Sequence, residues 1–198
     1  LLGASAPDLP RAEAMLDVVD KTLAQAGPAR PPEIVEELAF RRVQIALARE
    51  DDAQVTRRLD ELRALGGPLS LTADRMLYSR AARLWALAPE DESLARAVVA
   101  AGQRVIAQHP QPPQAFDDPN VPMLYAGIAE AAATVWRASQ DPTFRDLALG
   151  LDRALVDHGR ASAVGLRRLA LLSEQAGDPA RALDCWVLLL SGLPAASP

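Results

Sequence analysis

The sequence predicts an all-α protein of about nine helices, and three observations support this prediction. Valine and isoleucine are sparse, and no segment alternates polar and apolar residues with the period of two that strands need. Alanine, leucine, arginine and glutamate fill segments in which apolar residues recur at helical spacing. Prolines and glycines fall between these segments, where helices begin and end.

The first half of the chain contains five expected helices. They cover residues 11–25, 32–49, 53–65, 71–87 and 90–108. The first follows Pro10, ends at Gly27-Pro28, and places Met15, Val18 and Val19 on one face. The second begins at Pro32, because proline suits the first turn of a helix, and the third ends at Gly66-Gly67-Pro68.

Four more helices are expected after a proline-rich connector at residues 109–122. They cover residues 123–139, 144–157, 162–175 and 179–190. The connector holds five prolines, which exclude regular helix and favour an extended spacer between the first five helices and the last four. Phe116 within it is an alternative docking residue, for the helices or for a partner.

The 198 residues suit one helical-repeat domain spanning 1–198. Because the chain starts at Leu1 and ends in "GLPAASP", where another helix would begin, we expect it to be a fragment of a longer protein. The net charge of −5 argues against nucleic acid as a partner, since phosphate binding needs a basic surface. No apolar run approaches the roughly 18–20 residues of a membrane span, so no membrane insertion is expected. Cys185 is the only cysteine and is interpreted as a core residue. Because one cysteine cannot form a disulfide within the chain, the compartment stays open between cytoplasmic and secreted or periplasmic.

The usual signatures of catalysis and of metal or cofactor binding are missing. The chain has no glycine-rich phosphate loop and no Gly-x-Ser-x-Gly elbow, and its two histidines, His109 and His158, lie at expected helix ends. The acidic clusters "EDD" (residues 50–52) and "EDE" (residues 90–92) lie at the starts of expected helices, where carboxylates cap free backbone amides. We therefore expect no catalytic residue, metal or cofactor. A remote alternative, an α-helical enzyme domain, would need two or more of Asp117, Asp118 and His109 in close contact in a polar pocket.

The last expected helix pair carries a known repeat pattern. Taking Gly177 as the turn glycine of a unit of about 34 residues, the pattern positions fall on Leu166, Leu169, Ala170, Ser173, Ala182, Trp186 and Pro194. Only Ser173 departs, since an aromatic residue is expected there. The pair therefore resembles a tetratricopeptide repeat, and residues 123–157 and the earlier pairs resemble it more loosely.

The resemblance implies a right-handed solenoid of antiparallel helix pairs that serves as a scaffold for protein–protein interaction. In such arrays the first helices face a concave groove, where Arg167, Arg168 and Glu174 would bind a protein or peptide partner. Tyr78 and Tyr125 are expected to be anchors in the same groove.

Plainer alternatives remain for these residues and for the function. The arginine pairs, Arg167-Arg168 included, also suit a solvated face with partners one turn away, and the aromatic residues suit the core. The second candidate function is a structural or oligomerisation module that self-associates through exposed repeat ends.

Overall fold

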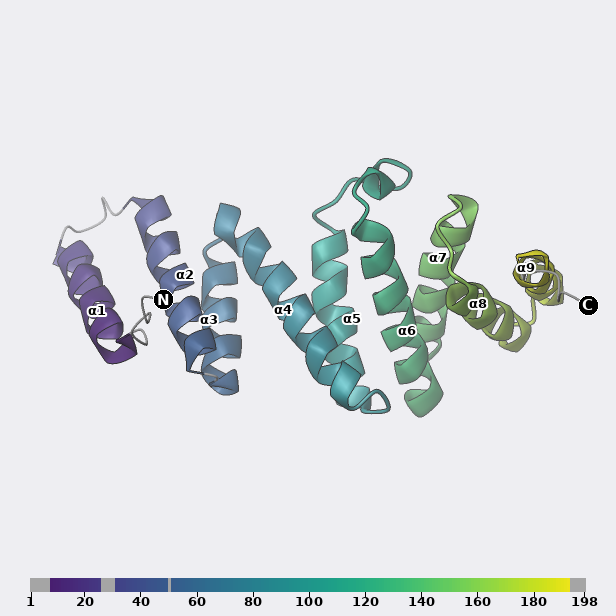
Figure 1. The fold of residues 1–198 in the computed structure, drawn as a ribbon, viewed down its shortest axis with the longest axis horizontal. Helices are drawn as coiled ribbons and strands as arrows, with labels where there is room; N and C mark the ends of the chain where they lie inside the picture. Colours follow the sequence, from purple (N-terminus) through teal and green to yellow (C-terminus); the bar gives the residue numbers. More distant parts are fainter. Residues whose placement is uncertain (1–7, 26–30, 50, 193–198) are drawn as a thin grey trace, which may run out of the picture. The chain divides into compact units, whose positions relative to one another are not determined.

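The computed structural model describes residues 8–25, 31–49 and 51–192, and the regular structure in these residues is entirely helical (Figure 1). The nine α-helices of this part are α1 (Leu9–Gln25), α2 (Pro32–Ala48), α3 (Asp52–Ala64), α4 (Pro68–Leu87), α5 (Glu92–Ile106), α6 (Val121–Ser139), α7 (Pro142–Asp157), α8 (Ala163–Gln175) and α9 (Pro179–Ser191). The expected all-α class with nine helices is therefore confirmed. Gly27-Pro28, Pro194 and both ends of the chain lie outside the described residues.

Side-chain caps and prolines set where the helices begin. In six helices the N-cap side chain accepts a hydrogen bond from a backbone amide of the first turn; these residues are Asp8, Asp51, Asp91, Asp141, Ser162 and Asp178. The capping role expected of the acidic clusters is thus confirmed for Asp51 and Asp91. The largest difference from the expected bounds is at α4, which begins at Pro68 instead of Leu71 because proline fits the first helical turn.

The chain forms two compact units, Leu1–Leu77 and Tyr78–Pro198, with the division inside α4. The first unit has a small core of α2, α3 and the first half of α4; it contains Val43, Ala46, Val55, Leu59, Leu62 and Ala73. A buried carboxylate completes it, because Glu36 of α2 accepts hydrogen bonds from the amides of Leu69 and Ser70 at the start of α4. This core includes no described residue of α1.

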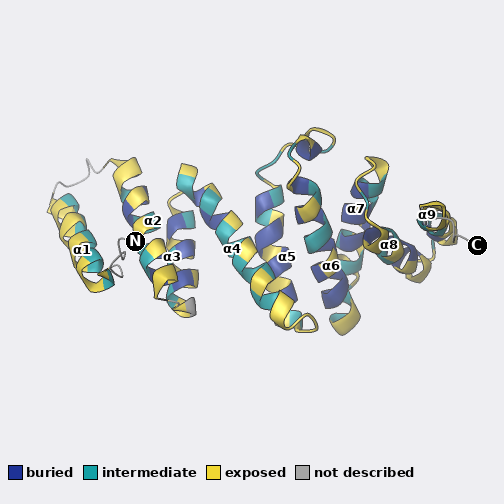
Figure 2. Cartoon of the chain, in the orientation of Figure 1, coloured by how far each residue is buried: buried dark blue, intermediate teal, exposed yellow. Residues whose placement is uncertain are grey.

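In the second unit each helix packs against the next one along the chain. Contacts join α5 to α6, α6 to α7, α7 to α8 and α8 to α9, and α6 also touches α8. The buried side of α6 is rich in alanine, which lets the neighbouring helices approach closely (Figure 2). Ala170 and Ala182, the small residues of the repeat pattern, are both buried, and so is Cys185, as expected.

The proline-rich connector lies inside the second unit and is not an extended spacer. Residues Gln114–Asp117 form a 3₁₀ helix, η2, that buries Ala115 and Phe116. The Phe116 ring packs edge-on against Tyr125, with 5.1 Å between centroids, and against His158 at 5.3 Å. The spacer interpretation was therefore wrong, because Ala115 and Phe116 of this segment are buried in the apolar core of the second unit. Instead, the alternative of Phe116 docking onto the helices is confirmed.

His158 is the C-cap residue of α7. The Nδ1 atom of His158 lies 2.8 Å from the carbonyl oxygen of Ala154, in the last turn of α7, so its expected helix-end role is confirmed. No helix in the described part combines the length and apolarity needed to cross a bilayer.

Candidate functional site

A groove of about 280 Å³ lies between α6 and α8 of the second unit. Both helices contribute apolar and charged side chains to it. The lining residues are Glu130, Ala133, Arg137, Val164, Arg167, Arg168, Leu171, Leu172 and Gln175. The groove thus brings together the two arginines that the sequence singled out and several residues that it did not.

The apolar part of the groove is open to solvent. Val164 is 64% exposed and Leu171 is 43% exposed, although both belong to a helix whose other side is packed in the core. Ala133 and Leu172, which are buried, also line the groove. Apolar side chains that share an open concavity are typical of surfaces that a partner covers.

Exposed charges reach this groove from both helices: Glu130 and Arg137 on α6, and on α8 the guanidinium of Arg167. The Arg167 side chain is exposed and makes no hydrogen bond or ion pair with any residue in the part of the chain that the structure describes. Arg137, on the α6 side, donates to the Thr134 hydroxyl and lies 4.0 Å from Glu90, with both charged groups mostly exposed. Such exposed pairs contribute little, so Arg137 remains accessible to a ligand.

Arg168 has a different role, because its guanidinium is held inside the fold. Its Nε and Nη2 atoms donate to the two carboxylate oxygens of Asp152 on α7, at 2.8 and 2.7 Å. Nη2 also lies 3.4 Å from the carbonyl oxygen of Ala126 on α6. The side chain of Arg168 is only 11% exposed and that of Asp152 is 1% exposed. Arg168 therefore ties three helices together beneath the groove.

The burial of Asp152 disfavours the charged form of its carboxyl group. Burial raises the pKa of the Asp152 carboxyl, against the lowering effects of its hydrogen bond to Arg168 and of the Arg168 charge. The nearby Glu130 charge raises this pKa further. Without the Arg168 guanidinium, the negative charge of the buried Asp152 carboxylate would have no compensating charge.

Three of the residues expected in the groove lie elsewhere. Glu174 accepts a hydrogen bond from the indole nitrogen of Trp186 on α9, at 3.0 Å, and is not among the lining residues. Tyr125 is buried under Phe116 in the core. Tyr78 is half-buried against Gly102 and Gly127, and a Cβ atom at Gly127 would collide with its hydroxyl. Burial raises the pKa of both tyrosines.

The sequence analysis missed Val164, Leu171, Gln175, Glu130 and Arg137. The signal for the first three was available, because residues 164, 167, 168, 171 and 175 recur at helical spacing and so share one face of α8. The residues from α6 carried no such signal, since nothing in the sequence indicates which face of α6 meets α8.

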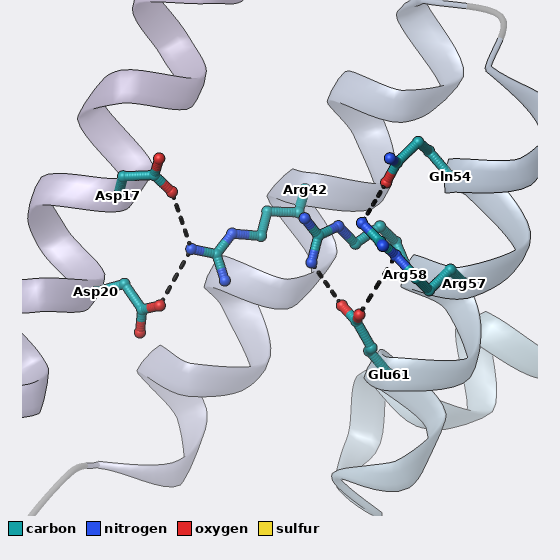
Figure 3. Close-up of polar contacts among 7 residues, drawn as sticks. All are labelled: Asp17, Asp20, Arg42, Gln54, Arg57, Arg58 and Glu61. Atoms are coloured by element: carbon teal, nitrogen blue, oxygen red, sulfur yellow. Dashed lines mark hydrogen bonds and ion pairs between the residues drawn. The ribbon is translucent and has the colours of Figure 1, made fainter.

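The other two arginine pairs of the sequence, Arg41-Arg42 and Arg57-Arg58, belong to the first unit and have partners there. Figure 3 shows the contacts of Arg42, Arg57 and Arg58. Arg57 and Arg58 both reach Glu61, at 3.7 and 2.7 Å, as the solvated-face interpretation predicts. Arg42 instead bridges to Asp17 and Asp20 on α1, at 3.2 and 3.1 Å. Arg42 thus links α1 to α2, whereas Arg57 and Arg58 form pairs within α3.

Within the described residues, no three or more His, Cys, Asp or Glu side chains are grouped so that they could hold a metal ion. Comparisons with known protein families, with curated proteins and with solved structures found no match for this chain. The groove between α6 and α8 therefore has to be interpreted from its own geometry.

Proposed function

We propose that this chain is a non-catalytic protein-interaction module that binds a segment of a partner protein in the groove between α6 and α8. One observation carries the proposal: the groove combines exposed Val164 and Leu171 with Arg167, whose charge has no partner in the described part of the chain. An apolar anchor surrounded by charges that fix orientation is the usual composition of a protein-binding surface.

The helix packing supports a tetratricopeptide-like solenoid for the second unit. In such an array the first helix of each pair touches its own second helix and the first helix of the next pair, and α6 touches both α7 and α8 in this way. Gly177, at a φ of 78°, makes the turn between α8 and α9, a backbone conformation that glycine adopts without strain. By this interpretation the groove is part of the concave face.

The ion pair beneath the groove favours binding by preorganisation. Arg168 and Asp152 fix α8 relative to α6 and α7, so the exposed face of α8 is presented without a large ordering cost. A partner would cover Leu171 and Val164 with an apolar side chain and place a carboxylate near Arg167. The expected recognition mode is a helix or extended peptide lying along α8.

Affinity capture from the source cell tests this function. The Arg167→Glu and Leu171→Glu variants each change one exposed residue of the groove, so both are expected to fold and to bind the captured partner at least about tenfold more weakly, which corresponds to about 1.4 kcal/mol. Arg83→Glu is the matched control, because Arg83 is an exposed arginine on α4 and does not line the groove.

The readout is the amount of each protein retained by wild type, by the two groove variants and by the control, with circular dichroism to show that all four are folded. Partners that Arg83→Glu retains and both groove variants lose support the proposal. Equal retention of every partner by the groove variants and the control contradicts it.

A further inference from the structure

Two helices outside the groove carry apolar stripes that no described residue covers. Figure 2 shows exposed residues along both of them, α1 and α9. On α1, Met15 and Val18 are each 62% exposed, and Val19 beside them is also exposed. On α9, Leu183 is 63% and Leu190 is 65% exposed, with exposed Val187 between them. Stripes of this kind on two helices exceed the scattered apolar residues of an ordinary surface.

The stripe on α1 points away from its own unit, because acidic residues hold the opposite side. Asp17 and Asp20 pair with Arg42 of α2 (Figure 3). Glu13 pairs with Arg49, at 2.7 Å. Residues 13, 17 and 20 share one face of the helix, and Met15 and Val18 lie on the other. No described residue of α1 is buried, and its acidic side chains form ion pairs with α2 and the residue that follows it.

On α9 the apolar stripe likewise lies opposite the side of the helix that packs in the core. This helix packs through Ala182 and Cys185, its only buried residues. Leu183, Val187 and Leu190 follow one another at four and three residues along the opposite face. Such a row is the pattern that one helix presents to another across an interface.

The two stripes are complementary in spacing and in charge. If α1 and α9 pack antiparallel with Val18 opposite Val187, Met15 falls opposite Leu190. The same register places Lys21, the only lysine of the chain, opposite Asp184. Neither Lys21 nor Asp184 has an ion pair within the described residues, so both charges are available to each other.

We propose that α1 of one copy packs antiparallel against α9 of a second copy, so that this chain associates head to tail with itself. Each copy carries both stripes, and their opposite charges favour pairing between unlike stripes over pairing between like ones. Because the contact joins different surfaces of the two copies, association adds further copies in a row or closes into a ring. The groove between α6 and α8 takes no part in it.

Sedimentation velocity over a range from about 1 to about 200 μM tests the association, because head-to-tail contacts of modest affinity form within this range. The wild-type mass is expected to increase with concentration beyond that of two copies. Val18→Glu and Val187→Glu each bury a charge in the proposed contact and are expected to remain single copies. Leu87→Glu is the matched control, because Leu87 is an exposed leucine on α4, and it is expected to associate like wild type.

Mixing the two defective variants distinguishes this arrangement from the alternatives. Val18→Glu keeps an intact α9 and Val187→Glu keeps an intact α1, so their mixture is expected to form pairs of one copy each and nothing larger. In a second test, Lys21→Asp is expected to weaken association about tenfold or more, and adding Asp184→Lys in the same chain is expected to restore it.

Three results would overturn the proposal. The first is a wild-type mass that stays at one copy throughout the range. The second is continued association of Val18→Glu alone, which would mean that α9 pairs with α9. The third is a mixture of the two variants that stays entirely single, since one intact contact should then remain.

Discussion

Arg167 and Arg168 are neighbours in the chain but have different roles. Arg167 is exposed in the groove, whereas Arg168 makes a two-bond ion pair with buried Asp152. Their difference follows from the helix, because successive residues point about 100° apart and only one of the two can face α7. A buried pair of this kind matters most when it is broken, since the remaining charge is then left without compensation.

The first prediction concerns this pair. Asp152→Ala is expected to lower the free energy of unfolding by about 3–5 kcal/mol, because it leaves the Arg168 guanidinium buried without its carboxylate. Urea denaturation followed by circular dichroism measures the change. Arg153→Ala is the matched control on α7, because Arg153 lies 3.7 Å from Asp178 in an exposed pair and is expected to contribute less than about 1 kcal/mol.

A second variant separates the loss of the pair from the loss of packing. Replacing both residues, as Asp152→Leu with Arg168→Met, removes both buried charges and is expected to recover most of the stability. If Asp152→Ala is no more destabilising than Arg153→Ala, then the carboxylate does not hold Arg168 in solution.

At the scale of elements, the 3₁₀ helix η2 shows where sequence patterns stop being sufficient. Five prolines correctly exclude an α-helix from much of residues 109–122, but they do not indicate that Phe116 is buried. That burial depends on Tyr125 of α6 and on His158 after α7, which belong to other elements of the fold. The connector is therefore packed structure whose position is fixed by one side chain.

The second prediction tests this anchor. Phe116→Ala is expected to cost about 3–5 kcal/mol of unfolding free energy, because it removes a buried ring that packs against two aromatic neighbours. Met123→Ala is the control, since Met123 is 68% exposed at the start of α6 and its loss is expected to change stability by less than about 0.5 kcal/mol. Thermal unfolding of both variants beside wild type gives the comparison. A Phe116→Ala variant as stable as Met123→Ala would mean that the connector is not anchored.

For the whole molecule, local signals predicted the elements and long-range packing decided the site. Prolines, glycines and capping aspartates lie within a few residues of the helix ends they define, so all nine described helices were predictable. The groove was predictable only in part. Arg167 lies in the groove, as its place on one helix indicated, whereas Tyr125 and Glu174 lie outside the groove lining and contact Phe116 and Trp186 of other elements.

The third prediction concerns the two cores. Leu59 is buried in the core of the first unit and Leu169 in that of the second, and no core residue is shared between them. Each Leu→Ala substitution is expected to cost about 2–5 kcal/mol through the cavity that it leaves. Because the cavities lie in separate cores, each loss is expected to remain within its own unit, and hydrogen exchange of the backbone amides resolves where protection falls.

The test compares amides of α2 and α3 with those of α6 to α8 in both variants. Leu59→Ala is expected to accelerate exchange in α2 and α3 alone, and Leu169→Ala in α6 to α8 alone. In the double variant the two losses are expected to add within about 0.5 kcal/mol, as they do for sites without shared partners. Loss of protection in both units from either single substitution would instead mean that α4, which contributes residues to both, makes them unfold as one cooperative body.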